Sequence, residues 1–333
     1  MSTYTLQKNT ISFIVLVTFS LLLVACSSTN TTKNNEQSID DTKEIASQDS
    51  SGNVMIVDHA GRELTFAEPP QRIVSLSQAD MEIVHALGGE IVGRPTSQGP
   101  VQPEELTNAE EVGNAHEMDF EKILSLKPDL VIGHARLNMK DVGTVESLGL
   151  NMLLTSMDSY EDIIESIGMY GDILALQTEA EVLIKSIEER KVSILSEGYD
   201  NEIKALIVFG TTESMMAALP TSLAGNLVDL VGITNIASDL PGIERYPNYA
   251  QLSMERVLSA NPDVIYFIAH GDGEAVKGKF EEELKSNAAW SNVNAMKNDN
   301  LVVLPAELFS SNPGPRIVDA LEFLQKSIRS IGK

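Results

Sequence analysis

The stretch RIVSLSQAD, residues 72–80, places polar backbone groups where a ligand can reach them. Its apolar part predicts a strand, and its polar part predicts the first turn of a helix. A strand that leads directly into a helix leaves the N–H groups of Gln78, Ala79 and Asp80 at the carboxyl edge of the sheet. We expect the Asp80 side chain to act as a cap. The pattern predicts a binding site for a carboxylate or a phosphate.

Motifs of known catalytic chemistry are missing from the sequence. It contains no nucleophile elbow, no HExxH, no P-loop and no GxGxxG after the first predicted strand. The five histidines are scattered, which disfavours a receptor for bare zinc or manganese. An enzyme, for example a metal-dependent hydrolase, stays open as an alternative, and turnover of the bound ligand would demonstrate it. The residues favour a binding protein over an enzyme.

Two stretches of the chain repeat each other. Residues 120–132, FEKILSLKPDLVI, and residues 254–266, MERVLSANPDVIY, each predict a short amphipathic helix, a Pro-Asp turn and a buried parallel strand. Three pairs of residues share one offset of 134 positions, namely Glu121 with Glu255, Pro128 with Pro262, and Asp129 with Asp263. The repeat predicts two related α/β lobes.

A long helix is predicted between the repeats, over residues 178–197. Thr178 and Glu181 have the spacing of a capping box, and apolar residues follow at helical spacing. The predicted organisation is therefore an N-terminal lobe over 54–177, a connecting helix over 178–197 and a C-terminal lobe over 198–333. Strands that alternate with helices predict parallel sheets covered on both faces.

The N-terminus predicts export and attachment to a membrane. Residues 1–25 have the basic start and the short apolar run of a signal peptide, and Leu-Val-Ala-Cys26 resembles the bacterial lipobox. Cys26 is the only cysteine, so no disulfide can form within one chain. Residues 26–53 are polar and predict a flexible tether that follows a lipidated cysteine. We expect the folded part to be lipid-anchored on the extracytoplasmic face.

The composition limits the classes of partner and of fold that we expect. The formal net charge of -24 disfavours a nucleic-acid partner, since phosphates would be repelled. A hydrophobic content of 43% with 22% charged residues, over 333 residues, is that of a globular protein with room for two domains.

Taken together, these motifs resemble those of one family, the substrate-binding proteins of ABC importers for iron chelates, haem and cobalamin. The resemblance covers residues 54–333 and rests on motifs in a fixed order: the lipobox, RIVSL before a helix, FEKILSLKPDLVI, one connecting helix, LSMERVLSANPDVI, and PGPRIVDAL. It implies two Rossmann-like lobes joined by one long helix (the class III periplasmic-binding-protein fold), and a monomer. It also implies that Glu121 and Glu255 dock onto arginines of the ABC permease dimer, where such charges contribute steering more than affinity.

Within the family, the chain looks most similar to the Isd-type haem-binding lipoproteins. That likeness implies haem b as the transported ligand, held between Met118 of the first lobe and His270 of the second, an established axial pair for haem iron. His116 is the rival of Met118, and His134 is a weaker candidate. Upstream haem-donor surface proteins are possible further partners that the likeness implies.

The rest of the expected haem site follows from loop positions. Gln78, Ala79 and Asp80 would bind the propionates. Candidates for the apolar walls are Met215, Met216, Tyr246 and Phe309.

A ferric siderophore is the alternative ligand, because anionic chelates suit arginine-lined clefts. The arginines considered for it are Arg94, Arg136, Arg245 and Arg316, of which Arg316 is expected to orient the last helix. Cobalamin is a third option.

Overall fold

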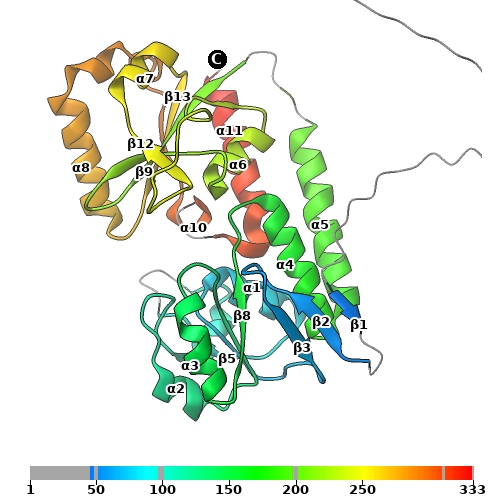
Figure 1. Cartoon of the computed structure of the whole chain (residues 1–333). Coiled ribbons are helices and arrows are strands. Elements are labelled where there is room, and N and C mark those ends of the chain that lie inside the picture. The colour runs from blue at the N-terminus through cyan, green and yellow to red at the C-terminus, as the bar shows by residue number, and fades with distance from the viewer. Residues whose placement is uncertain are drawn as a thin grey trace, which may run out of the picture. The chain divides into compact units, whose positions relative to one another are not determined.

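Strands and helices alternate along the chain, and they build two α/β lobes (Figure 1). The computed structural model describes residues 46–48, 52–96, 101–196, 198, 202–309 and 312–331. These residues belong to one compact unit, Glu44–Lys333. The predicted signal peptide and Cys26 lie outside the described residues, as does most of the predicted tether.

The first lobe contains a five-stranded sheet in which every pairing among the described strands is parallel. Its strands, in spatial order, are β6 Glu110–Glu111, β5 Ile91–Arg94, β4 Ile73–Ser75, β7 Leu130–His134 and β8 Asn151–Thr155. Its helices are α1 Gln78–Leu87, α2 Phe120–Ser125 and α3 Val142–Ser147, with 3-10 turns at Glu104–Asn108 and Met139–Asp141. The strand ends of such a sheet meet at one edge, which is where ligands bind in open α/β folds.

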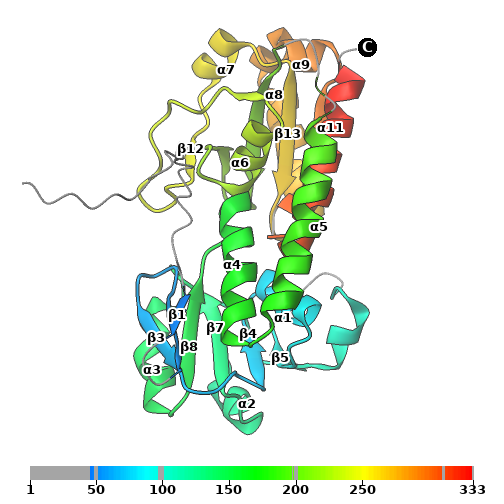
Figure 2. The same cartoon turned by 90° about the vertical axis from the view of Figure 1, so that its right-hand side faces the viewer.

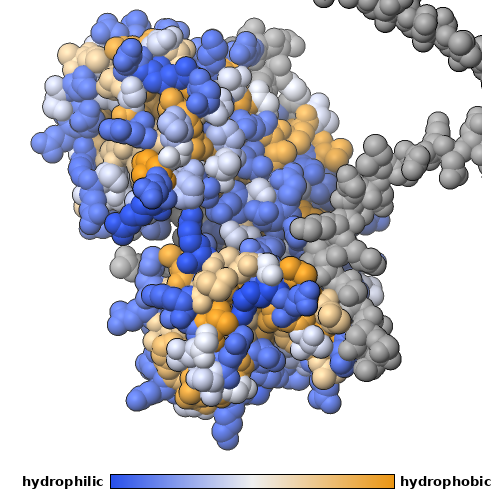
Figure 3. All heavy atoms as spheres, in the orientation of Figure 1, coloured by the Kyte–Doolittle hydropathy of each residue, from blue (hydrophilic) through white to orange (hydrophobic). Residues whose placement is uncertain are grey.

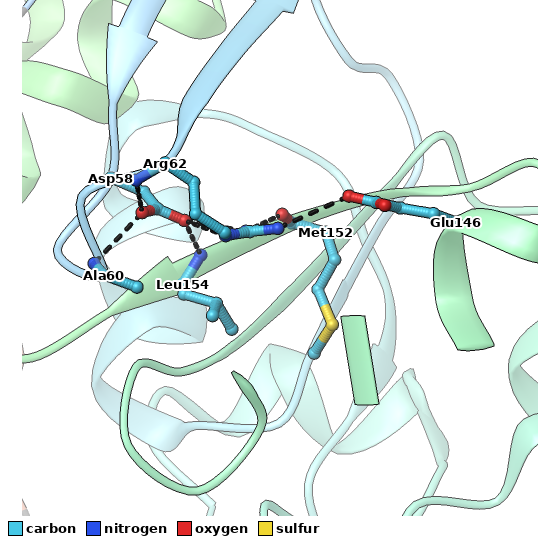
Figure 4. A network of polar contacts seen from close by, with 6 residues as sticks. All are labelled: Asp58, Ala60, Arg62, Glu146, Met152 and Leu154. Carbon is cyan, nitrogen blue, oxygen red and sulfur yellow. Dashed lines mark hydrogen bonds and ion pairs between the residues drawn. The ribbon is translucent and has the colours of Figure 1, made fainter. Parts of the chain in front are cut away.

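A small antiparallel sheet precedes this lobe. It comprises β1 Ala46–Gln48, β2 Val54–Val57 and β3 Glu63–Phe66, and the predicted hairpin of residues 54–66 is confirmed by the pairing of β2 with β3. The buried carboxylate of Asp58 organises its turn (Figure 4). It accepts the backbone N–H of Arg62 at 2.9 Å and that of Leu154 in β8 at 3.2 Å, and it forms an ion pair with the Arg62 guanidinium at 2.7 Å. This network fastens the hairpin to the edge of the first lobe.

The second lobe differs from the predicted all-parallel sheet, because part of its sheet is antiparallel. The strands are β12 Tyr249–Gln251, β10 Met215–Ala218, β9 Lys204–Gly210, β13 Val264–Ala269 and β14 Leu301–Val303, with β11 Thr234–Asn235 beside β9. Strand β10 runs antiparallel to both β9 and β12. The cause is a short turn: the Thr211 hydroxyl accepts the N–H groups of Glu213 and Ser214, so the chain reverses at once instead of entering a crossover helix.

The helices of the second lobe flank this sheet. They are α6 Leu223–Leu230, α7 Met254–Ala260, α8 Gly273–Ser286, α9 Asn294–Lys297, α10 Ala306–Phe309 and α11 Ile317–Ile331, with 3-10 turns at Ala288–Asn292 and Gly314–Arg316. Trp290, the only tryptophan of the sequence, is buried here with its ring nearly perpendicular to that of Phe280, which in turn stacks on Phe267.

Two consecutive helices, α4 Tyr160–Ile173 and α5 Gln177–Leu195, connect the lobes and pack on each other (Figure 2). Gly171 permits their close approach, since a Cβ there would lie 2.5 Å from that of Ala180. The helix predicted over residues 178–197 is present as α5, and α4 accompanies it, but the predicted capping box is wrong. Leu176 is the N-cap and no side chain caps the helix, because the helix begins at Gln177, before Thr178.

The repeat seen in the sequence corresponds to one structural unit used twice. Asp129 accepts the backbone N–H groups of Gln71 and Arg72 just before β4, at 2.7 and 2.9 Å. Asp263 accepts the N–H of Lys204 at the start of β9, at 3.0 Å. In each lobe the aspartate after the proline therefore ties the entry of one strand to the start of its parallel neighbour.

Candidate ligand-binding cleft

A cleft pocket of about 390 Å³ is lined by residues of both lobes, which is within the range of small-molecule sites. The first lobe contributes Ser77, Gln78, Ala79, Asp80, His134, Arg136, Thr155, Ser156, Met157 and Asp158. The second lobe contributes Phe209, Leu223, Tyr249, His270, Phe309 and Asn312. The first-lobe wall is thus mostly polar, whereas the second-lobe wall is mostly aromatic or apolar.

The predicted helix N-terminus, at the start of α1, lies in this cleft pocket. Its cap is Ser77, whose hydroxyl accepts the N–H of Asp80, so the expectation that Asp80 acts as the cap is wrong. The Asp80 carboxylate is buried and accepts hydrogen bonds from the hydroxyls of Tyr170 and Thr155. Burial raises the pKa of Asp80 above its usual value. An acidic group therefore stands beside the donors that were expected to bind an anion.

His134, at the end of β7, lies on the polar wall. Its Nδ1 accepts the backbone N–H of Arg136 at 3.1 Å. Burial is the main cause of its lowered pKa; the charges of Asp158 and Asp80 oppose this shift, while those of Arg136 and His116 add to it. The ring is therefore neutral at neutral pH.

His270 follows β13 on the opposite wall. Its backbone N–H donates to the Gly210 carbonyl at 2.9 Å, and its exposed imidazole lies 5.4 Å from the Phe209 ring. Phe209 also contacts Tyr249, at 4.7 Å between ring centroids. Burial raises the pKa of Tyr249 to about 12, so its hydroxyl stays protonated. Phe209, Tyr249 and His270 form an aromatic group that a flat conjugated ligand can pack against.

The structure does not bring Met118 to His270 in the cleft pocket. Met118 lines a separate hollow with Gly113 and Glu121, and it packs against the core of the first lobe. His116, two residues earlier, is exposed, and its charge acts on His134. Neither of the two predicted first-lobe iron ligands belongs to the described lining of the cleft pocket.

Among the predicted wall residues, Phe309 lines the cleft pocket. The described lining does not include the other three: Met215 and Met216 pack into the core of the second lobe, and Tyr246 lies against Arg245. Sequence reasoning missed Phe209 and Tyr249. Phe209 ends a predicted strand and could have been found from that position. Tyr249 could not, because it enters through the antiparallel part of the sheet.

Of the four arginines considered for a siderophore, only Arg136 belongs to the described lining of the cleft pocket. Arg94 pairs with Glu111 at 2.8 Å. Arg316 donates two hydrogen bonds, of 3.0 and 3.1 Å, to the buried carboxylate of Glu82 in α1. The Arg316 pair therefore joins the two lobes, which is a role beyond its expected effect on the last helix.

The two predicted docking glutamates occupy equivalent positions. Glu121 and Glu255 are both exposed and are each the second residue of a short helix, α2 and α7, which Asp119 and Ser253 cap.

The face seen in Figure 3 is largely hydrophilic. Over the described residues, no helix is long and apolar enough to cross a membrane. The same residues contain no group of three or more His, Cys, Asp or Glu side chains arranged to hold a metal ion.

Comparisons with known proteins identify the family. The periplasmic binding protein family model matches residues 73–308. An uncharacterised ABC transporter substrate-binding lipoprotein of Bacillus subtilis, YvrC, is 26% identical over 83% of this chain and 85% of its own length. The Staphylococcus aureus high-affinity haem uptake protein IsdE is 27% identical over 69% of this chain and 77% of its own length.

Solved structures agree with this assignment. The structure of S. aureus IsdE with haem matches with a TM-score of 0.67 and 26% identity, over 77% of this chain and 98% of that one. S. aureus SirA with staphyloferrin B matches with a TM-score of 0.67 over 84% of this chain and 98% of that one. At 20% identity, the SirA match shows the fold alone. The chain belongs to the periplasmic binding protein family, as a substrate-binding protein of an ABC importer and not an enzyme.

Proposed function

We propose that this protein captures haem in the cleft pocket outside the cytoplasmic membrane and delivers it to an ABC permease. The observation that carries the proposal is the division of the cleft pocket into a polar wall and an aromatic wall that ends in the exposed ring of His270. Haem has the matching parts: a flat apolar macrocycle, two carboxylates and an iron that binds imidazole. The name of the relative IsdE supports the same ligand class.

His270 is the proposed iron ligand from the second lobe. The opposite ligand comes from residues 114–118 of the first lobe, which contain His116 and Met118. His116 is exposed and Met118 lines a separate hollow, and neither belongs to the described lining of the cleft pocket, so either ligand requires this segment to rearrange. The side chain of Asn138 donates to the Ala115 carbonyl at 2.9 Å, which holds the segment beside the turn that follows His134.

A ferric siderophore is the second candidate, and Arg136 on the polar wall is the observation that favours it. The same wall carries the acidic groups Asp80 and Asp158, which disfavour a chelate with more negative charges than the two propionates of haem.

The remaining parts of the proposal concern attachment and transfer. Lipidation of Cys26 would keep the protein at the membrane surface, in keeping with the lipoprotein name of the relative YvrC. Glu121 and Glu255 present one carboxylate from each lobe, which suits a permease dimer with a matching pair of basic sites.

An absorption titration with ferric haem tests the function. The chain from Ser27 onward contains the whole compact unit Glu44–Lys333 and is the protein to use. We expect saturable one-to-one binding with a six-coordinate low-spin spectrum. His270→Ala should weaken binding by about tenfold or more, because it removes the imidazole ligand. His85→Ala, on α1 and outside the described lining, is the matched control.

The first-lobe ligand is decided by the spectra of His116→Ala and Met118→Ala. The variant that removes the ligand loses the six-coordinate spectrum, and the loss of affinity should be smaller for Met118→Ala than for His270→Ala, because a thioether is the weaker ligand. Absence of saturable haem binding, together with tight binding of a ferric siderophore, would replace haem by the second candidate.

A further inference from the structure

The strand that ends in His134 leads into a turn that fixes this side chain. Asn138 Oδ1 accepts the backbone N–H of His134 at 2.9 Å, and the N–H of Asn138 donates to the His134 carbonyl at 2.8 Å. Asn138 is itself completely buried, and its amide group donates to the Ala115 carbonyl and to Asp141. The backbone that positions the imidazole is therefore rigid before any ligand arrives.

The hydrogen bond to His134 Nδ1 determines where the ring carries its proton. The backbone N–H of Arg136 is a donor, so Nδ1 must present its lone pair. The neutral ring then has its proton on Nε2. His134 consequently offers the cleft pocket an N–H donor.

This tautomer disfavours His134 as an iron ligand. Coordination through Nε2 would move the proton to Nδ1, where it would face the N–H of Arg136 and the present hydrogen bond would be lost. An N–H donor instead selects an acceptor. The exposed guanidinium of Arg136 lines the same wall and adds a positive charge. The nearby carboxylate of Asp158 accepts the Ser156 hydroxyl at 3.0 Å and has a hydrogen-bond partner of its own.

We propose that His134 and Arg136 form the carboxylate-recognition site of the cleft pocket, with His134 Nε2–H as the directional donor. The inference rests on the proposed function and assigns one haem propionate to this pair. The start of α1 is the other source of donors, but the Asp80 carboxylate lies beside it and reduces its attraction for an anion.

The test compares haem with its dimethyl ester, which keeps the iron and the ring but has no carboxylates. Titrations use the chain from Ser27 onward with three changes: His134→Leu, His134→Gln and the control His85→Leu. We expect His134→Leu to lose about tenfold or more in affinity for haem, the typical weight of a charge-assisted hydrogen bond, and to keep its affinity for the ester. His134→Gln retains an N–H donor and should recover part of the loss.

The outcomes distinguish a failure of the carboxylate role of His134 from a failure of the proposed haem-binding function. Equal losses for haem and ester in His134→Leu would overturn the carboxylate role, and loss of the low-spin spectrum would make His134 an iron ligand instead. Nitrogen NMR of histidine-labelled protein reads the tautomer directly, and a proton on Nδ1 of His134 would also overturn the inference. If the unchanged protein binds neither haem nor its ester, the proposed function fails first.

Discussion

Two histidines, His134 and His270, stand at equivalent strand ends of the two related lobes, and their surroundings differ. His134 is half-buried in a turn held by Asn138, and its Nδ1 accepts a backbone hydrogen bond. His270 is exposed and lies against Phe209. Equivalent places in the two lobes thus support different chemistry: the first suits hydrogen bonding to an anion, and the second suits metal coordination.

The difference arises from the sheets behind the two residues. In the first lobe, parallel strands bring loops and helix starts to the cleft pocket, and these carry polar groups. In the second lobe, the antiparallel strands β10 and β12 replace part of that edge, and β12 brings Tyr249 beside Phe209. The antiparallel pairing in the second lobe therefore contributes one aromatic residue, Tyr249, to a wall that otherwise comes mostly from β9, from the end of β13 and from helices.

The largest expected loss of stability comes from removing the ion pair between Arg316 and Glu82, which joins the two lobes. Arg316→Met leaves the Glu82 carboxylate buried without its guanidinium partner, a change that typically costs about 3–5 kcal/mol of unfolding free energy. Urea unfolding measures it. Arg190→Met is the matched control, because the partners of Arg190 are half-exposed and such pairs contribute about 0–1 kcal/mol. Equal losses in the two variants would show that the lobes do not depend on this pair.

A smaller effect should distinguish the two copies of the Pro-Asp turn. Asp129→Ala removes two hydrogen bonds to backbone N–H groups and should cost about 1–2 kcal/mol, whereas Asp263→Ala removes one and should cost about 0.5–1 kcal/mol. The free energies of unfolding of both variants, measured under one set of conditions, give the comparison. A larger loss for Asp263→Ala would contradict this ranking.

The fold was largely predictable from the sequence, whereas the residues of the cleft pocket were predictable only in part. The hydrogen-bond partners of Asp129 and Asp263 lie far away in the chain and were not predicted. The repeat of residues 120–132 in 254–266 predicted both lobes, because the helix, the Pro-Asp turn and the strand of each copy follow from local sequence. The helix start at Gln78–Asp80 was predictable for the same reason. Tyr249 was not, because it reaches Phe209 from a strand far away in the chain. The tautomer of His134 was not, because it depends on the conformation of the turn that brings the Arg136 N–H to Nδ1.

The smallest expected effect is a change in how the free energy of unfolding depends on pH, and it arises from Asp80 on the polar wall. Because burial raises its folded-state pKa, the native protein holds this proton more tightly than the unfolded chain does. The stability contributed by protonated Asp80 is complete below the ordinary value of 3.8 and is lost as the pH rises through the raised pKa. Asp80→Asn lacks this titration.

We therefore expect the stability of the unchanged protein, relative to Asp80→Asn, to fall as the pH rises above about 4. Urea unfolding of both proteins across this pH range measures the difference. A constant difference at every pH would show that burial does not shift Asp80.

Trp290 makes the second lobe separately observable. It is the only tryptophan in the sequence, and it is buried against Phe280 in that lobe. Intrinsic fluorescence at tryptophan wavelengths therefore reports the melting of one half of the fold, whereas circular dichroism averages over both. Superimposable transitions from the two probes would show that the halves melt cooperatively, and separated transitions would show a partly folded intermediate. The fluorescence of Trp290 can therefore test, without any added label, whether the two lobes unfold together.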